Sequence, residues 1–493
     1  MTPDIMKRSS IALIVAALIA CGGAFAQEDP GLSSFNQGVQ CYEDNQLEAA
    51  RDAFQAALQE RPDDPTILVW LGSVSLQLGE TEAAIEHLTA AIEQDPDYPV
   101  SYNNLGNAYL ATGDLARAEE QYKKALELEP NYFDAQYNLA NLYARQEQYE
   151  KAFNAYTRAL EINPDDFEAH VSFGHALRKA GEMDKAIREF ALARDLNPQD
   201  AEVHTILGTL YIKGGQVQQA IDAYQAALGV NPEIVEAHVG LGLGLYNQGE
   251  YQQAIDHWRS AAELDETSFA ARYNMGLAYE ALDNYAGAAD AYTEALKVRP
   301  NDANTLNNLG SALYEQGKVS EAAGYFREAI AANPDLEVAY VNLALALESA
   351  DQNDEALAQW QEAVTRFPES AAAQAGIANL YYEQGNYDEA LPAYQRTLEL
   401  DPGNLEAHNN LGLIYLNRDN LTEAIVHFRD ALRTDPNYVY ALNNLGVALE
   451  MQGDLPGALE NYEKAIEVNP EYAPAKTNRD RIQRKLGAET ATG

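Results

Sequence analysis

The chain has 493 residues, of which 46% are hydrophobic and 9% aromatic, so it has ample apolar side chains for burial. Asp and Glu total 76 against 33 Lys and Arg, which gives a formal net charge of −43 at pH 7. A negative field of this size repels phosphate backbones and anionic lipid, and we therefore expect no nucleic acid among the partners. The acids are spread along the chain, which is typical of a solvated, self-repelling surface, although they would also attract basic peptides.

The first 26 residues have the pattern of an export signal peptide. Lys7 and Arg8 give it a basic start, and residues 11–20 form an apolar run that is too short for a permanent membrane-spanning helix. We therefore predict an exported chain, which is either periplasmic or anchored to the outer membrane as a lipoprotein. A short spacer over residues 27–30 follows the signal.

Two ways of processing this signal remain open. Ala24-Phe25-Ala26 is a small-x-small cleavage site that would release a soluble protein, whereas Leu18-Ile19-Ala20-Cys21 resembles a bacterial lipobox with Cys21 as the lipidated residue. The other cysteine, Cys41, is the one thiol of the remaining chain, so we expect no internal disulfide.

From residue 31 to residue 472 one pattern recurs every 34 residues, thirteen times, without insertion or deletion. Numbered within each repeat, position 32 is proline except at Glu266, position 20 is always alanine, and position 24 is aromatic except at Leu88. The repeats are 31–64, 65–98, 99–132, 133–166, 167–200, 201–234, 235–268, 269–302, 303–336, 337–370, 371–404, 405–438 and 439–472. Such a period indicates an array in which each unit buries surface only against its neighbours.

Each repeat predicts two helices of roughly 13–14 residues, joined by a tight turn into an antiparallel hairpin. In the third repeat Gly113 occupies the turn, where glycine can adopt the left-handed conformation, and Pro130 stops the second helix. Gly106 at position 8 and Ala118 at position 20 are expected to let the two backbones approach. The aromatic Tyr122 at position 24 then fills the gap to the following hairpin.

The order Leu-Gly-x-x-Tyr, then Ala-x-x-x-aromatic-x-x-Ala, then Pro, at a period of 34, resembles the tetratricopeptide repeat. The resemblance, to an exported bacterial type, implies an all-α fold: a right-handed α-solenoid superhelix of stacked helical hairpins. Residues 473–493 are predicted to form a capping helix and tail, since a terminal repeat needs a polar lid, although a basic binding helix is the alternative. The family's first-helix tryptophan is replaced at position 4, for example by Tyr102 and His170.

In the resembled fold, positions 2, 5, 6, 9, 12 and 13 of the first helix line the concave groove. Asparagine is a poor helix former, yet position 6 carries it in eight of the thirteen repeats. Its amide can donate to and accept from the backbone of an extended peptide, and the resemblance supports that role. Alternatively, these amides bond the neighbouring helix or water. The ligand-binding candidates on this row are Asn36, Asn104, Asn138, Asn274, Asn308, Asn342, Asn410 and Asn444.

Aromatic and basic residues share the predicted groove. Tyr137 and Tyr273 are candidate anchors for a ligand, with further aromatics at Tyr42, Trp70, Tyr246, Tyr314 and Tyr382. Arg145 and Lys179, with Arg178 and Lys213, form a basic cluster that would bind an acidic group. The family's lysine clamp for a terminal carboxylate is absent, because position 2 holds acids in these repeats.

The sequence carries no pattern of an enzyme or of a cofactor site. Gly240, Gly242 and Gly244 form a G-x-G-x-G, but they lie in a predicted helix with no preceding strand, so a dinucleotide site is not expected. His170, His204 and His238 recur 34 residues apart, and helices packed about 8–10 Å apart would not share one metal at about 2 Å. We therefore expect no catalytic residue, no cofactor and no metal.

These features favour a non-enzymatic scaffold of the bacterial envelope, which grips extended peptides or partner proteins in its groove. The alternative is a structural accessory of exopolysaccharide export or cell-wall assembly, in which the aromatic rows contact glycan. Membrane association is expected only through an N-terminal lipid.

Overall fold

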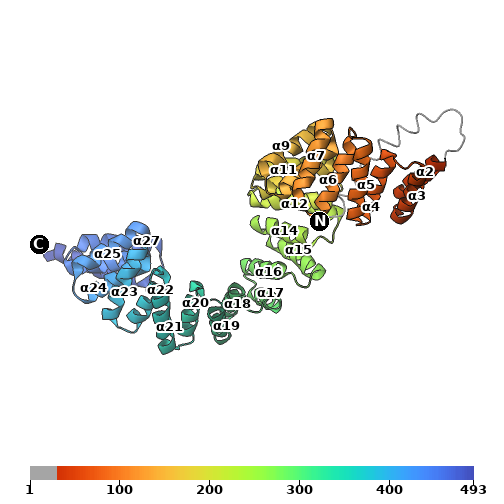
Figure 1. Ribbon diagram of the computed structural model, residues 1–493. Helices are drawn as coiled ribbons and strands as arrows, with labels where there is room; N and C mark the ends of the chain where they lie inside the picture. The colour runs from red at the N-terminus through yellow and green to blue at the C-terminus, as the bar shows by residue number, and fades with distance from the viewer. Residues whose placement is uncertain (1–29, 493) are drawn as a thin grey trace. The chain divides into compact units, whose positions relative to one another are not determined.

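The computed structural model describes residues 30–492 as two compact units, divided in the sequence between Gln248 and Gly249. All 27 regular elements of residues 30–492 are α-helices, and no strand occurs among these residues (Figure 1). The predicted all-α solenoid of helical hairpins is confirmed. The signal segment, with the candidate lipidation site Cys21, lies outside the described residues.

The first unit contains six hairpins and the first helix of the seventh repeat, in chain order. Its helices are α2 (Pro30–Glu43), α3 (Leu47–Glu60), α4 (Pro65–Gln77), α5 (Thr81–Gln94), α6 (Pro99–Thr112), α7 (Leu115–Leu128), α8 (Phe133–Arg145), α9 (Tyr149–Ile162), α10 (Phe167–Lys179), α11 (Met183–Leu196), α12 (Ala201–Lys213), α13 (Val217–Val230) and α14 (Val235–Asn247).

The second unit begins with the second helix of the seventh repeat and continues through six hairpins to a final helix. Its helices are α15 (Tyr251–Leu264), α16 (Phe269–Ala281), α17 (Tyr285–Val298), α18 (Ala303–Glu315), α19 (Val319–Ala332), α20 (Glu337–Ser349), α21 (Asn353–Arg366), α22 (Ala371–Glu383), α23 (Tyr387–Leu400), α24 (Leu405–Asn417), α25 (Leu421–Thr434), α26 (Val439–Gln452), α27 (Leu455–Val468) and α28 (Ala473–Thr492). None of the helices in the described chain is long and apolar enough to cross a membrane.

The turn inside each hairpin has the left-handed backbone that the sequence predicts. Gly113 has φ +83°, and Asn45, where another repeat lacks glycine, has φ +59°. Even Glu147, a poor residue for this conformation, has φ +59°. The amide of Asp114 then donates to the carbonyl of Tyr109 at 2.9 Å, which satisfies a carbonyl of the helix end.

The turn between hairpins is fixed by proline and by a side-chain cap. Glu129, which precedes Pro130, is extended at φ −135° and ends α7, since the residue before proline avoids the helical region. In other repeats the residue before the next first helix caps it. For example, the backbone N–H of Ala169 donates to the Asp166 carboxylate at 2.9 Å.

The aromatic ring at position 24 determines how closely the helices pack. A Cβ added at Gly106 would lie 2.6 Å from the ring of Tyr122, so the glycine at position 8 makes room for the ring of its own hairpin. This corrects the expectation that Gly106 serves the approach of the two backbones. The ring also reaches the next hairpin, because a Cβ at Gly240 would lie 2.2 Å from Tyr224.

Gly244, which also lies in α14, makes room for a side chain of the preceding helix in the same way as Gly240. A Cβ at Gly244 would lie 2.8 Å from Ile221, so both glycines allow α14 to pack closely on α13. Close packing therefore accounts for this part of the G-x-G-x-G pattern.

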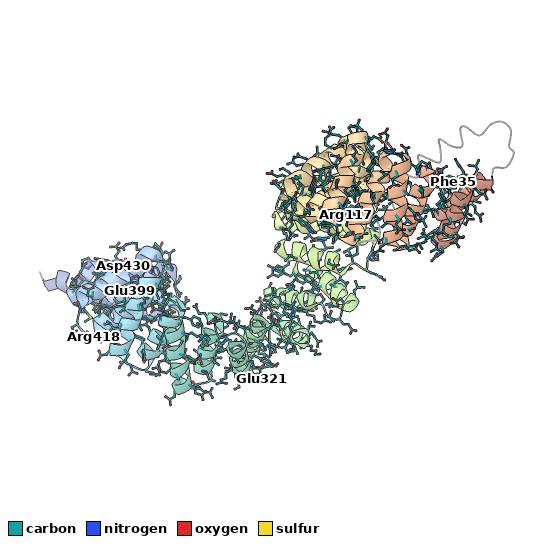
Figure 2. The ribbon with its side chains drawn as sticks, viewed as in Figure 1. Phe35, Arg117, Glu321, Glu399, Arg418 and Asp430 are labelled. Atoms are coloured by element: carbon teal, nitrogen blue, oxygen red, sulfur yellow. The ribbon has the colours of Figure 1, made fainter. Side chains whose placement is uncertain are left out.

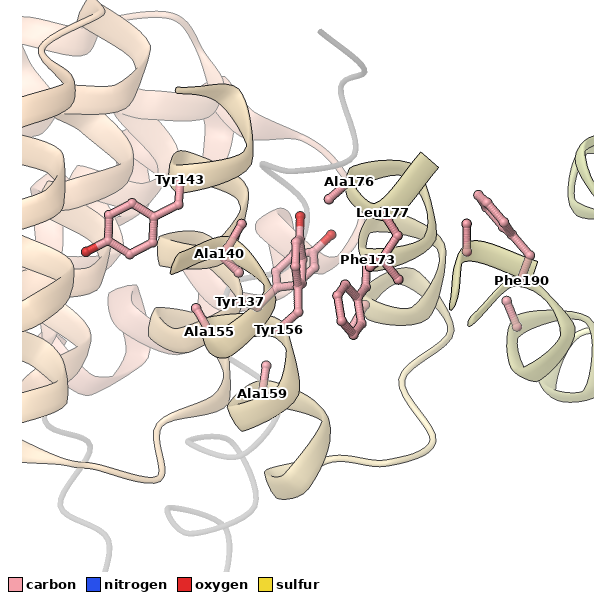
Figure 3. Close-up of a cluster of buried hydrophobic side chains, with 14 of the residues drawn as sticks. Tyr137, Ala140, Tyr143, Ala155, Tyr156, Ala159, Phe173, Ala176, Leu177 and Phe190 are labelled. Carbon is pink, nitrogen blue, oxygen red and sulfur yellow. The ribbon is translucent and has the colours of Figure 1, made fainter. Parts of the chain in front are cut away.

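Buried residues form several hydrophobic clusters along each unit, and aromatic rings link some of the successive hairpins. In the first unit Tyr156 stacks on Phe173 of the next repeat with centroids 5.2 Å apart, and Tyr137 meets Tyr156 edge-on at 6.3 Å (Figure 3). Charged side chains such as Glu321 and Glu399 project from the helices (Figure 2). Hydrophobic burial is thus confined to the seams between neighbouring helices.

The glycine–ring contact predicts opposite effects of alanine at two glycines of the ninth repeat. At Gly310 in α18 a Cβ would lie 2.6 Å from Phe326, and we expect Gly310→Ala to destabilise the second unit by about 1–3 kcal/mol. Urea unfolding followed by circular dichroism would measure the change.

The matched control is Gly324→Ala in α19, where no atom lies within 4 Å of the added Cβ. That variant should gain stability, by about 0.5–1 kcal/mol, because alanine is the better helix former. Equal losses in both variants would contradict the proposed contact.

Candidate functional site

The first helices of neighbouring repeats lie side by side, so that residues 35 apart in sequence face each other. The hydroxyl of Tyr137 in α8 lies 2.9 Å from that of Ser172 in α10, and Tyr314 in α18 lies 2.6 Å from Ser349 in α20. Within each unit the candidate groove is therefore a surface of adjacent first helices. We call the side chains at positions 2, 9, 12 and 13 of these helices the first-helix face.

Asparagines form a hydrogen-bonded ladder between the first helices. The amide of Asn138 donates to the carbonyl oxygen of Asn103 at 2.9 Å, and Asn103 donates to Asn104 at 3.2 Å. The same inter-helix bond joins Asn342 to Asn307 at 3.0 Å, Asn444 to Asn409 at 2.9 Å and Asn478 to Asn443 at 3.0 Å. We call this set the amide ladder.

Where the preceding helix lacks an asparagine, the ladder residue bonds another group. Asn104 donates to the Ser73 hydroxyl at 3.0 Å, Asn308 to Tyr273 at 3.3 Å, and Asn410 to Tyr394 at 2.9 Å. These bonds lie between neighbouring repeats, which is the alternative that the sequence left open. An additional role of the amides in ligand binding stays a prediction.

The exposure of the ladder residues varies along the chain. Asn104 and Asn138 are buried, each with 6% of its surface exposed, whereas Asn36 is exposed. Asn274, Asn308, Asn342, Asn410 and Asn444 are half-buried.

In several repeats the residue at position 9 accepts a hydrogen bond from the buried tyrosine at position 24. The Tyr122 hydroxyl donates to Asn107 at 2.7 Å, and Tyr394 donates to Asn379 at 2.6 Å. Where position 24 is phenylalanine, position 9 holds no asparagine, as in the repeats of Phe54 and Phe428. The position-9 amides therefore have a structural role, because a buried hydroxyl must keep a hydrogen-bond partner.

Two repeats supply a glutamate at position 12 for the same purpose. The indole N–H of Trp360 donates to Glu348, and burial raises the pKa of this carboxyl. The Tyr462 hydroxyl donates to Glu450 at 3.2 Å, and Glu450, unlike Glu348, also pairs with basic side chains.

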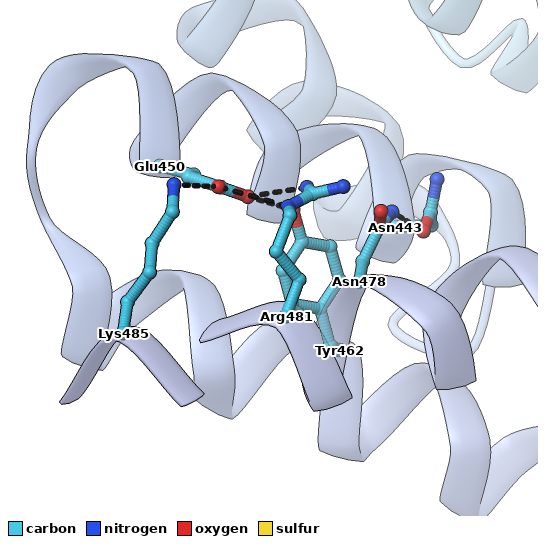
Figure 4. Close-up of polar contacts among 6 residues, drawn as sticks. All are labelled: Asn443, Glu450, Tyr462, Asn478, Arg481 and Lys485. Atoms are coloured by element: carbon cyan, nitrogen blue, oxygen red, sulfur yellow. Dashed lines mark hydrogen bonds and ion pairs between the residues drawn. The ribbon is translucent and has the colours of Figure 1, made fainter. Parts of the chain in front are cut away.

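Glu450 lies between the last repeat and the final helix (Figure 4). Lys485 of α28 donates to it at 2.7 Å, and Arg481 donates through two nitrogens, with Nε at 3.1 Å. The hydrogen bonds from Arg481, with that from Lys485, lower the pKa of this carboxyl to about 2. Arg481, Lys485 and Asn478 thus join α28 to the first helix α26, while α28 also packs on α27.

The histidines at position 4 also have a shared structural role. The Nε2 atoms of His170, His204 and His238 lie 2.9–3.0 Å from the carbonyl oxygen of the proline six residues earlier. Tyr102 makes the same contact with the carbonyl of Pro96 at 3.0 Å. The sequence did not reveal this bond, although the recurrence of a donor at position 4 was its signal.

His170 also contacts the residue at position 23 of its own repeat. Its Nδ1 lies 2.7 Å from Glu189. Burial alone would lower the pKa of His170, but the bond to Glu189 outweighs burial and raises it.

The basic candidates are exposed on the first-helix face of the first unit. Arg145, Lys179 and Lys213 hold position 13 of three successive first helices, and each has its side chain exposed. None of the three has an ion-pair partner among the described residues. We call them the basic row. In the second unit the same position carries Glu315 and Glu383 instead.

The aromatic candidates are less accessible. Tyr137 is 7% exposed and Trp70 only 2%, so both belong to the core, whereas Tyr273 is half-buried. The second unit does expose other apolar side chains on its first-helix face: Val338, Leu345, Tyr440 and Met451. These four residues were not predicted from the sequence, because the repeat pattern marks the aromatic rows, which are needed for packing, and not single exposed apolar side chains.

Family models cover most of the repeat region. Tetratricopeptide-repeat models match residues 72–113, 103–167, 376–439 and 439–472. A model described as the C-terminal domain of cilia and flagella-associated protein 70 matches residues 161–377. No curated protein matches the chain.

The chain is also similar to several solved structures. YrrB, described as a TPR protein with an unusual peptide-binding site, is 23% identical over 39% of this chain and 99% of its own, with a TM-score of 0.34. Yeast Tom70 is 19% identical over 86% and 96%, with a TM-score of 0.38. The Cut9–Hcn1 hetero-tetramer of APC/C gives 15% identity over 90% and 100%, with a TM-score of 0.39.

The amide ladder predicts that Asn409 and Asn444 are energetically coupled. Each single alanine variant should lose about 1 kcal/mol, and the double variant should lose less than the sum, because one hydrogen bond is removed in all three. A double-mutant cycle by urea unfolding would measure this. Asn417→Ala, at the exposed end of the same helix α24, is the control and should change stability by less than about 0.5 kcal/mol. Strict additivity would argue against the ladder.

Glu450 predicts a pH-dependent contribution to stability. Because its pKa is lowered from 4.5 to about 2 in the folded chain, the contribution is complete above about pH 4.5 and is lost as the pH falls towards 2. Arg481 and Lys485 are half-exposed, so we expect about 1 kcal/mol from the ion pairs.

Thermal unfolding of Glu450→Gln and of the unchanged chain between pH 2.5 and pH 7 would test this expectation. The difference should be constant above pH 5 and shrink below it. A difference that does not vary with pH would show that Glu450 acts through packing alone.

Proposed function

Since the chain is a tetratricopeptide-repeat protein, we propose that it is a non-enzymatic scaffold that binds partner proteins through its first-helix face. Proteins built from this repeat generally mediate protein–protein interactions. The amide ladder and the position-9 residues hold the helices together. Partner contacts are therefore expected from side chains that are not needed to hold the repeats together. These are mainly the exposed residues at positions 2 and 13.

The observation that carries the proposal is the basic row. Arg145, Lys179 and Lys213 are exposed cations without ion-pair partners among residues 30–492, in a chain whose formal net charge is −43. Each lies in the last turn of its helix, where a cation also stabilises the helix dipole by about 0.3–1 kcal/mol. That local role does not neutralise their charge, so an acidic partner segment can still bind them.

The spacing of the row sets the kind of segment that fits. Neighbouring helices pack about 8–10 Å apart, and a peptide in the extended polyproline-II conformation advances about 3.1 Å per residue with every third side chain on the same side. Three cations on successive helices therefore match carboxylates about three residues apart. We infer that the first unit binds an extended segment in which Asp or Glu recurs at about every third residue.

The second unit supplies a different surface for the same partner or another one. At its first-helix face Val338 is 46% exposed and Tyr440 is 55% exposed. Glu315 and Glu383 at position 13 would repel an acidic segment there. The proposal therefore assigns acidic recognition to the first unit and apolar contacts to the second.

We further propose that the scaffold acts outside the cytoplasm, in the bacterial envelope, as a periplasmic protein or as a lipoprotein anchored through Cys21. The basic start, the apolar run and the two processing motifs of residues 1–26 support this location. Nucleic acid is not proposed as a partner, because the net negative charge opposes it. A glycan-binding role draws less support, since the rings of Trp70 and Tyr137 are buried.

The basic row predicts a defined loss of binding. Peptides selected from a random display library against the full chain should be enriched in acidic residues about three apart. The variant Arg145→Gln, Lys179→Gln, Lys213→Gln should bind such a peptide about tenfold or more weakly, because charge-assisted bonds are lost. Fluorescence anisotropy at two salt concentrations would measure affinity, and the unchanged chain should lose affinity at the higher salt.

The control is Arg158→Gln, Lys185→Gln, Arg188→Gln, which changes the net charge equally on second helices of the same unit. Its binding should remain close to that of the unchanged chain. If both triple variants lose affinity alike, only the overall charge matters and the basic row is not the site. Selection of peptides without acidic residues would also overturn the proposal.

A further inference from the structure

The twelfth repeat brings two imidazoles and a carboxylate together between its facing helices. His408 lies in α24, while His427 and Asp430 lie in α25, and one ligand atom from each residue lies within 4.8 Å of the others. The two Nδ1 atoms of the histidines are 3.1 Å apart. His408 is 8% exposed, so its ring is held in place, and the ring of Tyr415 stacks on His427 at 5.5 Å.

The outer nitrogen of His408 fixes its tautomer. Nε2 lies 3.1 Å from the carbonyl oxygen of Pro402, and a carbonyl can only accept, so Nε2 carries the hydrogen. In the neutral ring Nδ1 then presents its lone pair towards His427. A histidine that donates one N–H to a backbone carbonyl while the other nitrogen is free is the usual arrangement of a metal ligand.

The distances suit one shared ion. Two nitrogens 3.1 Å apart can each lie about 2.0–2.1 Å from a metal, with an angle at the metal of about 100°, near the tetrahedral value. The carboxylate of Asp430 supplies a third ligand from the next turn of α25. Its ion pair with Arg433 at 2.8 Å is a weak competitor, because the Arg433 side chain is 80% exposed.

Space for further ligands is present beside this cluster. A surface pocket of about 300 Å³ is lined by Leu398, Pro402, His408, Asp430, Arg433 and Thr434. Water or a partner's side chain could therefore complete the coordination. Figure 2 labels Asp430, which lies in α25.

Other repeats show what distinguishes this cluster. The sixth repeat has a similar pocket of about 250 Å³ at His204, but Ala223 and Ala226 stand where His427 and Asp430 stand in the twelfth. In sequence, the seventh repeat has His238 and His257 at the same two positions, with Ser260 in place of the aspartate. The full set of three ligands, two histidines and one carboxylate, occurs in the twelfth repeat alone among the thirteen.

We propose that His408, His427 and Asp430 bind a divalent transition-metal ion, which links the two helices of the twelfth repeat. Imidazole nitrogens with one carboxylate suit zinc, nickel or copper rather than calcium or magnesium. This revises the expectation that the chain has no metal site, which considered only histidines on successive first helices and overlooked His427 on the facing helix. The inference is independent of the partner-binding function.

The test uses the full chain without an affinity tag and zinc as the probe. Competition with a chromophoric chelator should give a saturable site, and zinc should raise the melting temperature relative to EDTA, because a ligand of the folded state stabilises it. His427→Ala and Asp430→Asn should each weaken binding by about tenfold or more and remove the thermal shift. Circular dichroism would confirm that both variants remain helical.

His204→Ala and His257→Ala are the controls, and both should bind zinc as the unchanged chain does. The variant Ala223→His, Ala226→Asp rebuilds the cluster in the sixth repeat and should add one further zinc equivalent. The proposal is overturned if zinc neither binds nor stabilises the unchanged chain, or if His427→Ala and Asp430→Asn bind normally. In that case the two histidines share a hydrogen bond only.

Discussion

The structure depends on one contact that recurs in nearly every repeat: an aromatic ring at position 24 packed against a small residue at position 8. The ring of Tyr122 occupies the space where a Cβ of Gly106 would be, and the ring of Tyr224 occupies that of Gly240 in the next hairpin. An aromatic side chain buries about 150–250 Å², so this contact supplies much of the apolar burial that each hairpin needs. It also explains the period, because each ring must meet a glycine or alanine in register.

Because of that contact, the first helices must supply hydrogen-bond acceptors for the buried rings. A tyrosine or tryptophan in this place buries a donor, and the donor must find an acceptor. Asn107 supplies one for Tyr122, and Glu348 supplies one for Trp360. Phenylalanine removes the requirement, and the acceptor then disappears from the sequence, as beside Phe428. Many polar residues that resemble a ligand-binding row are thus part of the packing.

In such a chain, function is expected from residues that are not part of the packing and hydrogen bonding shared by all repeats. The basic row is exposed at position 13 and differs between the two units, whereas the position-20 alanines are buried in every repeat. The histidine cluster follows the same logic. The proline-bonded histidine at position 4 is a shared feature, and only the addition of His427 and Asp430 makes the twelfth repeat chemically distinct. Differences between repeats are therefore more informative than their common pattern.

The sequence alone determined the period, the helical hairpins and the residues of each turn, because these depend on local propensity and on spacing along one chain. Asn45 and Gly113 could be placed in left-handed turns without a structure, since the repeat marks that position thirteen times. Only the tertiary structure decided which side chains have hydrogen-bond partners within the chain. Asn138 donates to Asn103 because first helices lie side by side, an arrangement that no single helix encodes. His427 and His408 face each other for the same reason: residues 19 apart in sequence meet only when the hairpin closes.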